Sequence, residues 1–209
     1  MTQQPQKPER YHHGNLRVSL IGAGRTILEE GGLGALSLRA VARRAGVSHA
    51  APAHHFASLG LFLSACAASG FAEFSEALLA ARARGHTPAL AMAEMGRAYL
   101  AFARAHPALF RLMFNHDAIA QRTAEHAEEG ARAYQILVDA VRALDERVDD
   151  ETLEFRTLAI WSLAHGHADL MLERQVGARC DAPDQVLPMA QQQVARALLV
   201  LMRGFDASS

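Results

Sequence analysis

Cysteine is scarce in this sequence, which contains only Cys66 and Cys180 among its 209 residues. Neither has histidine or cysteine neighbours at metal-ligand spacing, and none of the eleven histidines lies three or four positions from another. A helix of this chain would therefore present no pre-aligned pair of histidine ligands. We expect no metal and no other cofactor, and we expect both cysteines to be reduced and packed inside the protein.

The sequence also lacks a long apolar run. No segment approaches the length needed to cross a bilayer, and the N-terminal stretch MTQQPQKPERYHHG contains no apolar signal segment. We therefore expect a soluble, cytoplasmic protein with no membrane partner. Catalytic signatures are missing as well: the chain has no Gly-rich phosphate loop, nucleophile elbow or paired-carboxylate pattern. The sequence therefore does not predict an enzyme.

Aromatic residues make up only 6% of the chain, whereas apolar residues make up half of it. Alanine is abundant, and because it is the strongest helix former, this composition favours close-packed helices over sheets. A chain of 209 residues can bury a substantial core in one domain or in two small ones. We therefore predict an all-α protein.

The formal net charge is only −1, but the charges are unevenly distributed. Residues 1–56 carry seven Lys and Arg against three Glu, a net charge of +4 that leaves −5 for the remainder. A basic N-terminal part on an acidic remainder is the asymmetry expected of a small DNA-binding domain joined to a domain for effector binding or dimerisation.

The most informative stretch is residues 35–56. Ser37 can cap a short helix, and Gly46 stands where that helix must end, because glycine tolerates a left-handed conformation. Ser48 can cap a second short helix that runs to about His55. Two short helices joined by a Gly-containing turn form a helix-turn-helix, whose second helix typically lies in the major groove of DNA. The same corner occurs in helical domains that never bind DNA, so that alternative stays open.

Two groups of side chains in this stretch can reach DNA. The second helix offers only His49, Ala50 and His54 to base edges, so few contacts would read the DNA sequence directly. The residues expected at the phosphate backbone are Ser37, Arg39, Arg43, Arg44, Ser48, His54 and His55.

Helical periodicity and turn residues divide the chain into four parts. We expect a flexible arm at residues 1–13, the helix-turn-helix domain at 14–57, a linking helix at 58–84, and an effector-binding and dimerisation domain at 85–209. Within the last part, helices are expected over residues 88–105, 108–114, 120–147, 152–175 and 184–203.

In the C-terminal part, methionine and aromatic side chains recur at three- and four-residue steps. A cavity lined by such residues would suit an apolar ligand, with a few polar groups to orient it. The candidate lining residues are Met92, Met95, Tyr99, Phe102, His106, Phe110, Met113, Phe114, Trp161 and His165. Each of them could instead belong to a plain hydrophobic core, and His165 could be a core histidine bonded to a neighbouring group.

The helix expected over residues 152–175 is apolar on two sides. One apolar stripe runs from Leu158 to Leu172, and the other runs from Leu153 to Met171. A helix that is apolar on two sides must be buried on two sides. One side can therefore face its own domain and the other a second subunit.

Several motifs make this sequence similar to the TetR-type repressor family. The N-terminal motifs are Asn15–Arg17, Ala23, Ile27–Gly31, Ala35–Leu38, Val41–Ala42, Ala45–Ser48 and His55–Phe56. Three further segments resemble the subgroup whose C-terminal part is called the WHG-type domain, namely Tyr11–Arg17, His106–Phe114 and Trp161–Gly166. The resemblance covers nearly the full length of the chain.

This resemblance implies a four-helix dimer interface, built from the last two helices and their symmetry mates. The two-fold axis would place two helix-turn-helix motifs on a palindromic operator. We therefore predict a ligand-responsive, homodimeric transcriptional regulator, a repressor, with double-stranded operator DNA and a small apolar or amphipathic effector as its partners.

The sequence departs from the family pattern at three positions. Ala53 stands where the family usually has a tyrosine, and Leu59 stands where it commonly has a lysine. Ala40 replaces the acidic residue that would complete a capping box with Ser37. The first two changes remove phosphate anchors, so the alternative is a dimeric, all-α small-molecule-binding protein with weakened or lost DNA binding.

Overall fold

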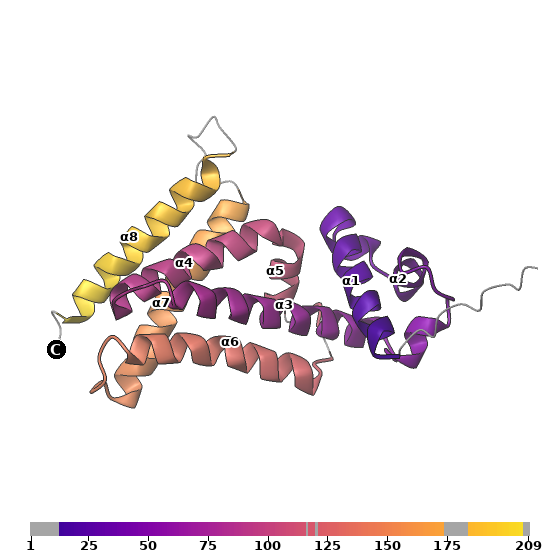
Figure 1. The fold of residues 1–209 in the computed structure, drawn as a ribbon, viewed down its shortest axis with the longest axis horizontal. Coiled ribbons are helices and arrows are strands. Elements are labelled where there is room, and N and C mark those ends of the chain that lie inside the picture. The colour runs from indigo at the N-terminus through magenta and orange to yellow at the C-terminus, as the bar shows by residue number, and fades with distance from the viewer. Residues whose placement is uncertain (1–12, 116, 120, 174–183, 207–209) are drawn as a thin grey trace, which may run out of the picture.

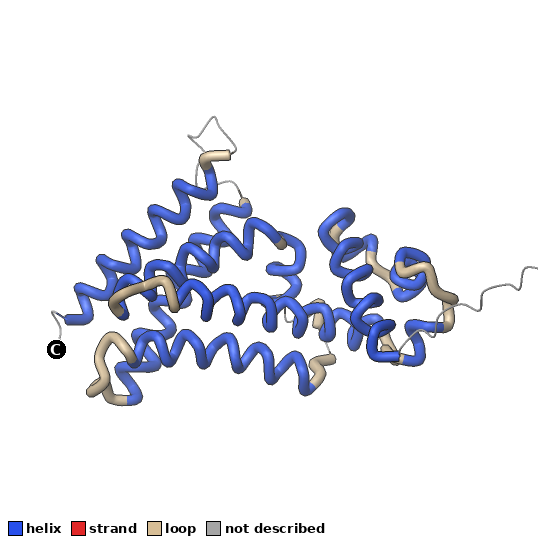
Figure 2. The backbone as a smooth tube through the Cα atoms, viewed as in Figure 1, coloured by secondary structure: helices blue, strands red, loops and turns tan. Residues whose placement is uncertain are grey.

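The computed structural model describes residues 13–115, 117–119, 121–173 and 184–206, and these residues contain helices and loops but no strand (Figure 2). The predicted all-α fold is confirmed. The α-helices are α1 (His13–Gly31), α2 (Leu38–Arg44), α3 (Leu59–Arg82), α4 (Pro88–Ala105), α5 (Pro107–Phe114), α6 (Ala124–Arg142), α7 (Asp150–Leu172) and α8 (Val186–Asp206). Apart from His13, the predicted N-terminal arm lies outside the described residues, as does Cys180.

The head of the molecule consists of α1, α2 and two short 3-10 helices, η1 (Leu33–Ala35) and η2 (Ala51–His54). The predicted cap of α2 is present: the Ser37 hydroxyl accepts a hydrogen bond from the Ala40 N–H at 3.1 Å. Gly46 follows α2 with φ = +68°, the left-handed conformation expected where that helix ends.

The second helix of the motif differs from the prediction. The sequence predicts a helix from Ser48 to His55, but the structure has only η2, which begins at Ala51. Pro52 explains the difference, because it has no N–H to bond to the Ser48 carbonyl, and its ring would clash with that carbonyl in an α-helix. The Ser48 carbonyl instead accepts a hydrogen bond from the Ala51 N–H at 3.0 Å.

The body consists of α3 to α8 (Figure 1). Helix α3 leaves the head and runs through the body, where α4, α5 and α6 pack against it, while α7 and α8 pack against α4. Helix α6 is shorter than the predicted 120–147, because Thr123 begins it as a cap and accepts the His126 N–H at 3.2 Å. None of the described helices is long and apolar enough to cross a membrane.

The head joins the body at a tightly filled contact between α1 and α3. The Phe62 ring is fully buried and meets the Phe56 ring edge to face, with 4.9 Å between ring centroids. Gly24 of α1 lies directly over Phe62, and a Cβ atom at Gly24 would lie 2.3 Å from that ring. The two helices therefore approach as closely as they do only because residue 24 has no side chain.

Cys66 is buried in α3 and forms no disulfide. Burial raises the pKa of its thiol to about 12, although Arg25 and Arg17 act in the opposite direction. The thiol therefore stays protonated and unreactive at neutral pH, as a packed core residue. In the part of the chain that the structure describes, no cluster of His, Cys, Asp or Glu could hold a metal ion.

Candidate functional site

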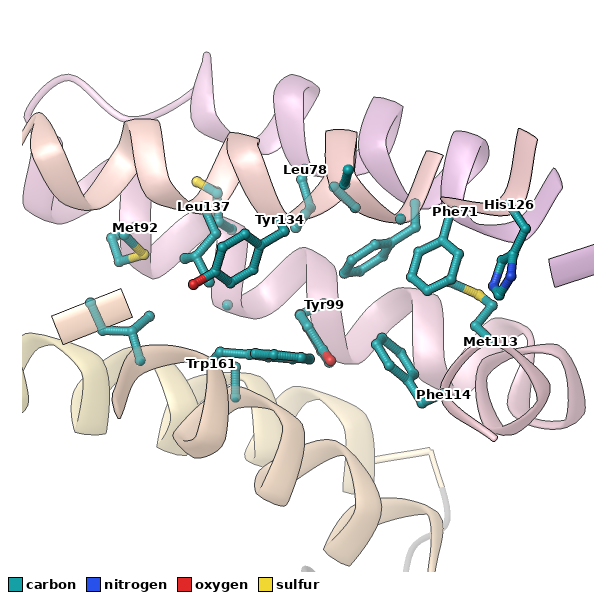
Figure 3. A pocket seen from close by; sticks show the side chains of 18 of the residues that line it. Phe71, Leu78, Met92, Tyr99, Met113, Phe114, His126, Tyr134, Leu137 and Trp161 are labelled. Carbon is teal, nitrogen blue, oxygen red and sulfur yellow. The ribbon is translucent and has the colours of Figure 1, made fainter. Parts of the chain in front are cut away.

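A cavity of about 340 Å³ lies inside the body, with walls formed by α3, α4, α5, α6, α7 and α8 (Figure 3). Six of the ten predicted ligand-binding residues line it, namely Met92, Met95, Tyr99, Met113, Phe114 and Trp161. The aromatic side chains contact one another around the space, as Phe114 does with Trp161 at 6.4 Å between ring centroids. An apolar cavity of this size can hold a small organic molecule.

The other four predicted residues, Phe102, His106, Phe110 and His165, are not part of the lining. His165 lies behind Tyr99, with its Nδ1 atom 2.7 Å from the Tyr99 hydroxyl and its Nε2 atom 3.5 Å from an Asp169 carboxylate oxygen. Asp169 favours a proton on Nε2, which leaves Nδ1 to accept the hydrogen bond from the hydroxyl. Burial raises the pKa of Tyr99, so its hydroxyl stays neutral and holds this bond.

Sequence analysis missed the cavity walls that α3 and α6 supply. Phe71 and Phe74 of α3 line the cavity, as do Ala131, Tyr134 and Leu137 of α6. A signal for the α6 residues exists, because they recur at three-residue steps and share one face of the helix. The α3 residues give no distinguishing signal, since phenylalanines at helical spacing are equally typical of a filled core.

The cavity opens to solvent along α6. Arg122, Ala127, Ala131 and Tyr134 all line the cavity and keep exposed side chains. Tyr134 is 40% exposed, and its ring meets Trp161 across the opening at 6.0 Å between centroids. A ligand can therefore enter along α6 without unfolding of the core.

One end of the cavity is polar. His126 lines it with 6% exposure, beside Phe71 and Met113 (Figure 3), and its Nδ1 atom is buried without a hydrogen-bond partner. Burial lowers the pKa of His126, and the nearby charge of Arg122 lowers it further. His126 is therefore held in its neutral form, and one of its ring nitrogens is free for a ligand.

Helix α5 connects the cavity wall to the head. The Glu29 carboxylate of α1 accepts hydrogen bonds from the N–H groups of Ala108 and Leu109 at 3.1 and 2.9 Å. These are unpaired donors of the first turn of α5, so a carboxylate of the head caps this helix. Met113 and Phe114 at the other end of the same short helix line the cavity.

Two ion pairs add to this connection. Arg17 of α1 lies 2.5 Å from Glu125 in the first turn of α6, and Arg25 lies 2.5 Å from Glu73 of α3. Glu73 also lies 3.1 Å from the Nε2 atom of His106. Burial alone would raise the pKa of Glu73, but its bonds to Arg25 and His106 outweigh burial and lower it, so Glu73 stays ionised.

The predicted DNA-contacting residues lie on the head, where only His55 is partly buried and the others are exposed. Arg44 is bonded to Glu30 within the head, which offsets its charge. Arg39 and Arg43 are exposed and form no ion pair with any described residue. These two arginines are therefore the head cations most available to phosphate.

Apolar side chains remain exposed on the last two helices. Phe155, Leu158 and Leu170 of α7 are 66%, 54% and 46% exposed, and Val200 of α8 is 61% exposed. The three α7 residues recur at helical spacing and form one stripe on its outer side. An apolar stripe of this kind on a helix surface is typical of an interface with another molecule.

Comparisons with known proteins match both parts of the chain. The family model for tetracycline repressor-like C-terminal domains matches residues 92–197, and the model for bacterial regulatory proteins of the tetR family matches residues 20–59. No curated protein is similar enough to match.

Solved structures share the fold over most of the chain. A protein of unknown function from Rhodococcus sp. RHA1 is 30% identical, with a TM-score of 0.73 over 91% of this chain and 99% of its own. A TetR family transcription regulator from Marinobacter aquaeolei VT8 is 18% identical, with a TM-score of 0.63 over 88% and 95% of the two chains. RolR, solved in complex with resorcinol, is 18% identical, with a TM-score of 0.59 over 90% and 88%.

Proposed function

Since the chain belongs to the TetR family of bacterial regulatory proteins, we propose that it is a homodimeric transcriptional repressor that a small ligand releases from operator DNA. One observation carries this proposal: a single chain holds an apolar cavity and a helix-turn-helix, and α5 joins them through its bonds to Glu29. RolR, which shares the fold, binds resorcinol, and this supports a small organic effector for the cavity.

The coupling between the two sites follows from the position of α5. A ligand that occupies the cavity contacts Met113 and Phe114, and it displaces α5 when it binds more tightly to a conformation in which these two side chains have moved. Because Glu29 holds the other end of α5, that shift changes the position of α1 and of the head. Helix α3 is the second connection, since it runs from the head into the cavity wall. Ligand and DNA then oppose each other's binding.

The apolar stripe on α7, together with Val200 of α8, is the proposed dimer interface. Burial of this stripe against a second copy would remove exposed apolar side chains from water. A two-fold dimer would present two heads to a palindromic operator, with half-sites about one helical turn of DNA apart or a small multiple of that.

The DNA-binding part is tested with duplexes that the purified protein selects from a random pool. We expect binding that weakens as salt rises, because Arg39 and Arg43 displace counterions from phosphates. Arg43→Gln should lower the affinity roughly three- to tenfold. The slope of log K against log salt concentration should become shallower by about 1 for each subunit. Arg44→Gln is the matched control, and it should change the affinity less because Glu30 already offsets the Arg44 charge.

A second candidate function is supported by the structure of η2. The α-helix that would enter the major groove is reduced to a 3-10 helix at Ala51–His54, and Ala53 supplies no phosphate anchor. This favours a ligand-binding dimer that does not bind DNA specifically. If no duplex is selected even at low salt while small-molecule extracts still alter the fluorescence of Trp161, the second function holds. Trp161 suits this purpose because it is the single tryptophan of the chain and lines the cavity.

A further inference from the structure

The polar end of the cavity combines two groups that suit one kind of ligand atom. Arg122 and His126 both line this end, and the buried Nδ1 atom of His126 has no hydrogen-bond partner. A buried ring nitrogen without a partner is unfavourable in the empty protein, and a ligand that bonds to it removes that penalty. The end also lies at the N-terminus of α6, where the helix dipole adds positive potential.

The charge at the polar end of the cavity is positive. Among the described residues that line the cavity, Arg122 is the only charged side chain, and it forms no ion pair with any described residue. None of the α6 carboxylates is among the described lining residues. Glu125 bonds to Arg17, and the Glu129 Oε2 atom, which has no hydrogen-bond partner, lies 3.6 Å from the Arg132 guanidinium. At this end an anionic oxygen would find a partner in Arg122, whereas a cationic ligand group would be repelled by Arg122.

The rest of the cavity is apolar, and aromatic side chains form much of its wall beside Met, Leu and Ile side chains. Phe71 meets Phe114 edge to face at 5.5 Å between ring centroids, and Tyr134 meets Trp161 in a similar edge arrangement at 6.0 Å. Aromatic rings pack well into such sites in offset or edge-to-face geometry. A volume of about 340 Å³ lies at the small end of the range of ligand pockets, which suits a small ligand with a single ring.

We propose that the effector is a small aromatic acid, whose carboxylate lies between Arg122 and His126 and whose ring lies among Phe71, Phe114 and Trp161. This inference rests on the proposed function, because it names the chemical class of the effector for the same cavity. Arg122 supplies the charge that selects the acid, and His126 supplies the hydrogen bond that fixes its position.

Three probes of similar size test the head group, namely 3-phenylpropanoate, 3-phenylpropanamide and 3-phenylpropylamine. Each is titrated into the full-length protein while the fluorescence of Trp161 reports occupancy of the cavity. We expect the acid to bind about tenfold more tightly than the neutral amide, and the amine to bind more weakly than both. An amide or amine that binds as tightly as the acid would overturn the proposal, as would a lack of response to all three.

Two variants separate the roles of the polar groups. Arg122→Gln should weaken binding of the acid about tenfold and leave binding of the amide unchanged. The control is Arg111→Gln, which removes an exposed charge from α5 outside the lining and should change neither affinity. Equal effects of the two variants on the acid would contradict selection by Arg122.

His126→Phe should weaken binding of both acid and amide, because either head group can bond to the ring nitrogen. It should also raise the melting temperature of the ligand-free protein, since it removes a buried nitrogen that has no partner. A role for His126 in core packing alone would change the melting temperature without changing either affinity.

The outcomes also distinguish this inference from the proposed function. If acid and amide bind equally and both release selected DNA, the proposal of an acidic effector is wrong, and the proposal of a ligand-responsive regulator is supported. If the acid binds through Arg122 but leaves DNA binding unchanged, the proposal of an acidic ligand is supported, and the proposal that this cavity regulates DNA binding is wrong.

Discussion

The head and the body of this chain differ in what their interiors contain. The core of the head is filled: Leu20 and Val41 have no exposed surface, and Gly24 is needed to admit the Phe62 ring at the junction with α3. The space beside Arg43 and Arg44, between α1 and α2, is an open depression of the surface. The body is hollow, with methionine and aromatic side chains around a space of about 340 Å³.

This difference shows how side chains of the same type serve different purposes. A phenylalanine in the filled junction has neighbours on every side, so its contacts contribute to the free energy of folding. A phenylalanine on the cavity wall lacks partners on one side, and it makes those contacts only when a ligand is present. The body therefore keeps part of its packing energy available for binding.

The comparison predicts unequal costs for the same substitution. Phe62→Ala should lower the free energy of unfolding by about 3–5 kcal/mol, because the ring is fully buried between α1 and α3. Phe114→Ala should lower it by only about 1–2 kcal/mol, because the ring borders the cavity and is partly exposed. Denaturant unfolding at one protein concentration measures both, and equal costs would mean that the cavity closes in solution.

A smaller effect is expected where the two regions meet. Glu29→Ala removes the acceptor for two N–H groups of α5 and should lower the free energy of unfolding by about 1 kcal/mol. It should also weaken the release of DNA by ligand, because α5 is no longer held to α1. Glu30→Ala is the adjacent control: among the described residues Glu30 pairs only with exposed Arg44, so we expect an effect of a few tenths of a kcal/mol and unchanged release of DNA. If ligand still releases DNA normally from the Glu29 variant, then α5 does not transmit ligand binding to the head.

The smallest effect concerns the pH dependence of stability. Burial, followed by the charge of Arg122, lowers the pKa of His126 below its usual 6.5, so the unfolded chain binds a proton there more readily than the folded protein does. Stability should therefore fall as the pH drops below 6.5. Glu73 has a lowered pKa, and its contribution is lost only as the pH falls below 4.5, so of these two groups His126 begins to destabilise the protein at the higher pH.

His126→Phe should flatten the loss of stability below pH 6.5, whereas His86→Gln, at an exposed histidine, should leave the pH profile unchanged. Urea unfolding at pH values on either side of 6.5 measures how steeply the free energy of unfolding changes with pH. An unchanged slope in the His126 variant would mean that another group causes the loss.

Most of the helical fold could be predicted, but less of the candidate site. The cap at Ser37 and the turn at Gly46 follow from residues a few positions apart, and the structure has both. The η2 segment was mispredicted although its signal, Pro52, is visible in the sequence. The lining supplied by α3 could not be recognised, because a stripe such as Phe71 and Phe74 looks the same whether it faces a filled core or a cavity.

The sequence alone determined the all-α fold and the corner at Gly46, because caps, turns and helical periodicity depend on interactions between near neighbours. The family followed from the resemblance of its motifs. Only the tertiary structure decided that Arg44 is offset by Glu30, that Glu29 caps α5 some eighty residues away, and that the body is hollow. The physical reason is that a cavity depends on the distances between helices. Those distances result from the packing of many side-chain pairs at once, and the pattern of a single helix does not contain them.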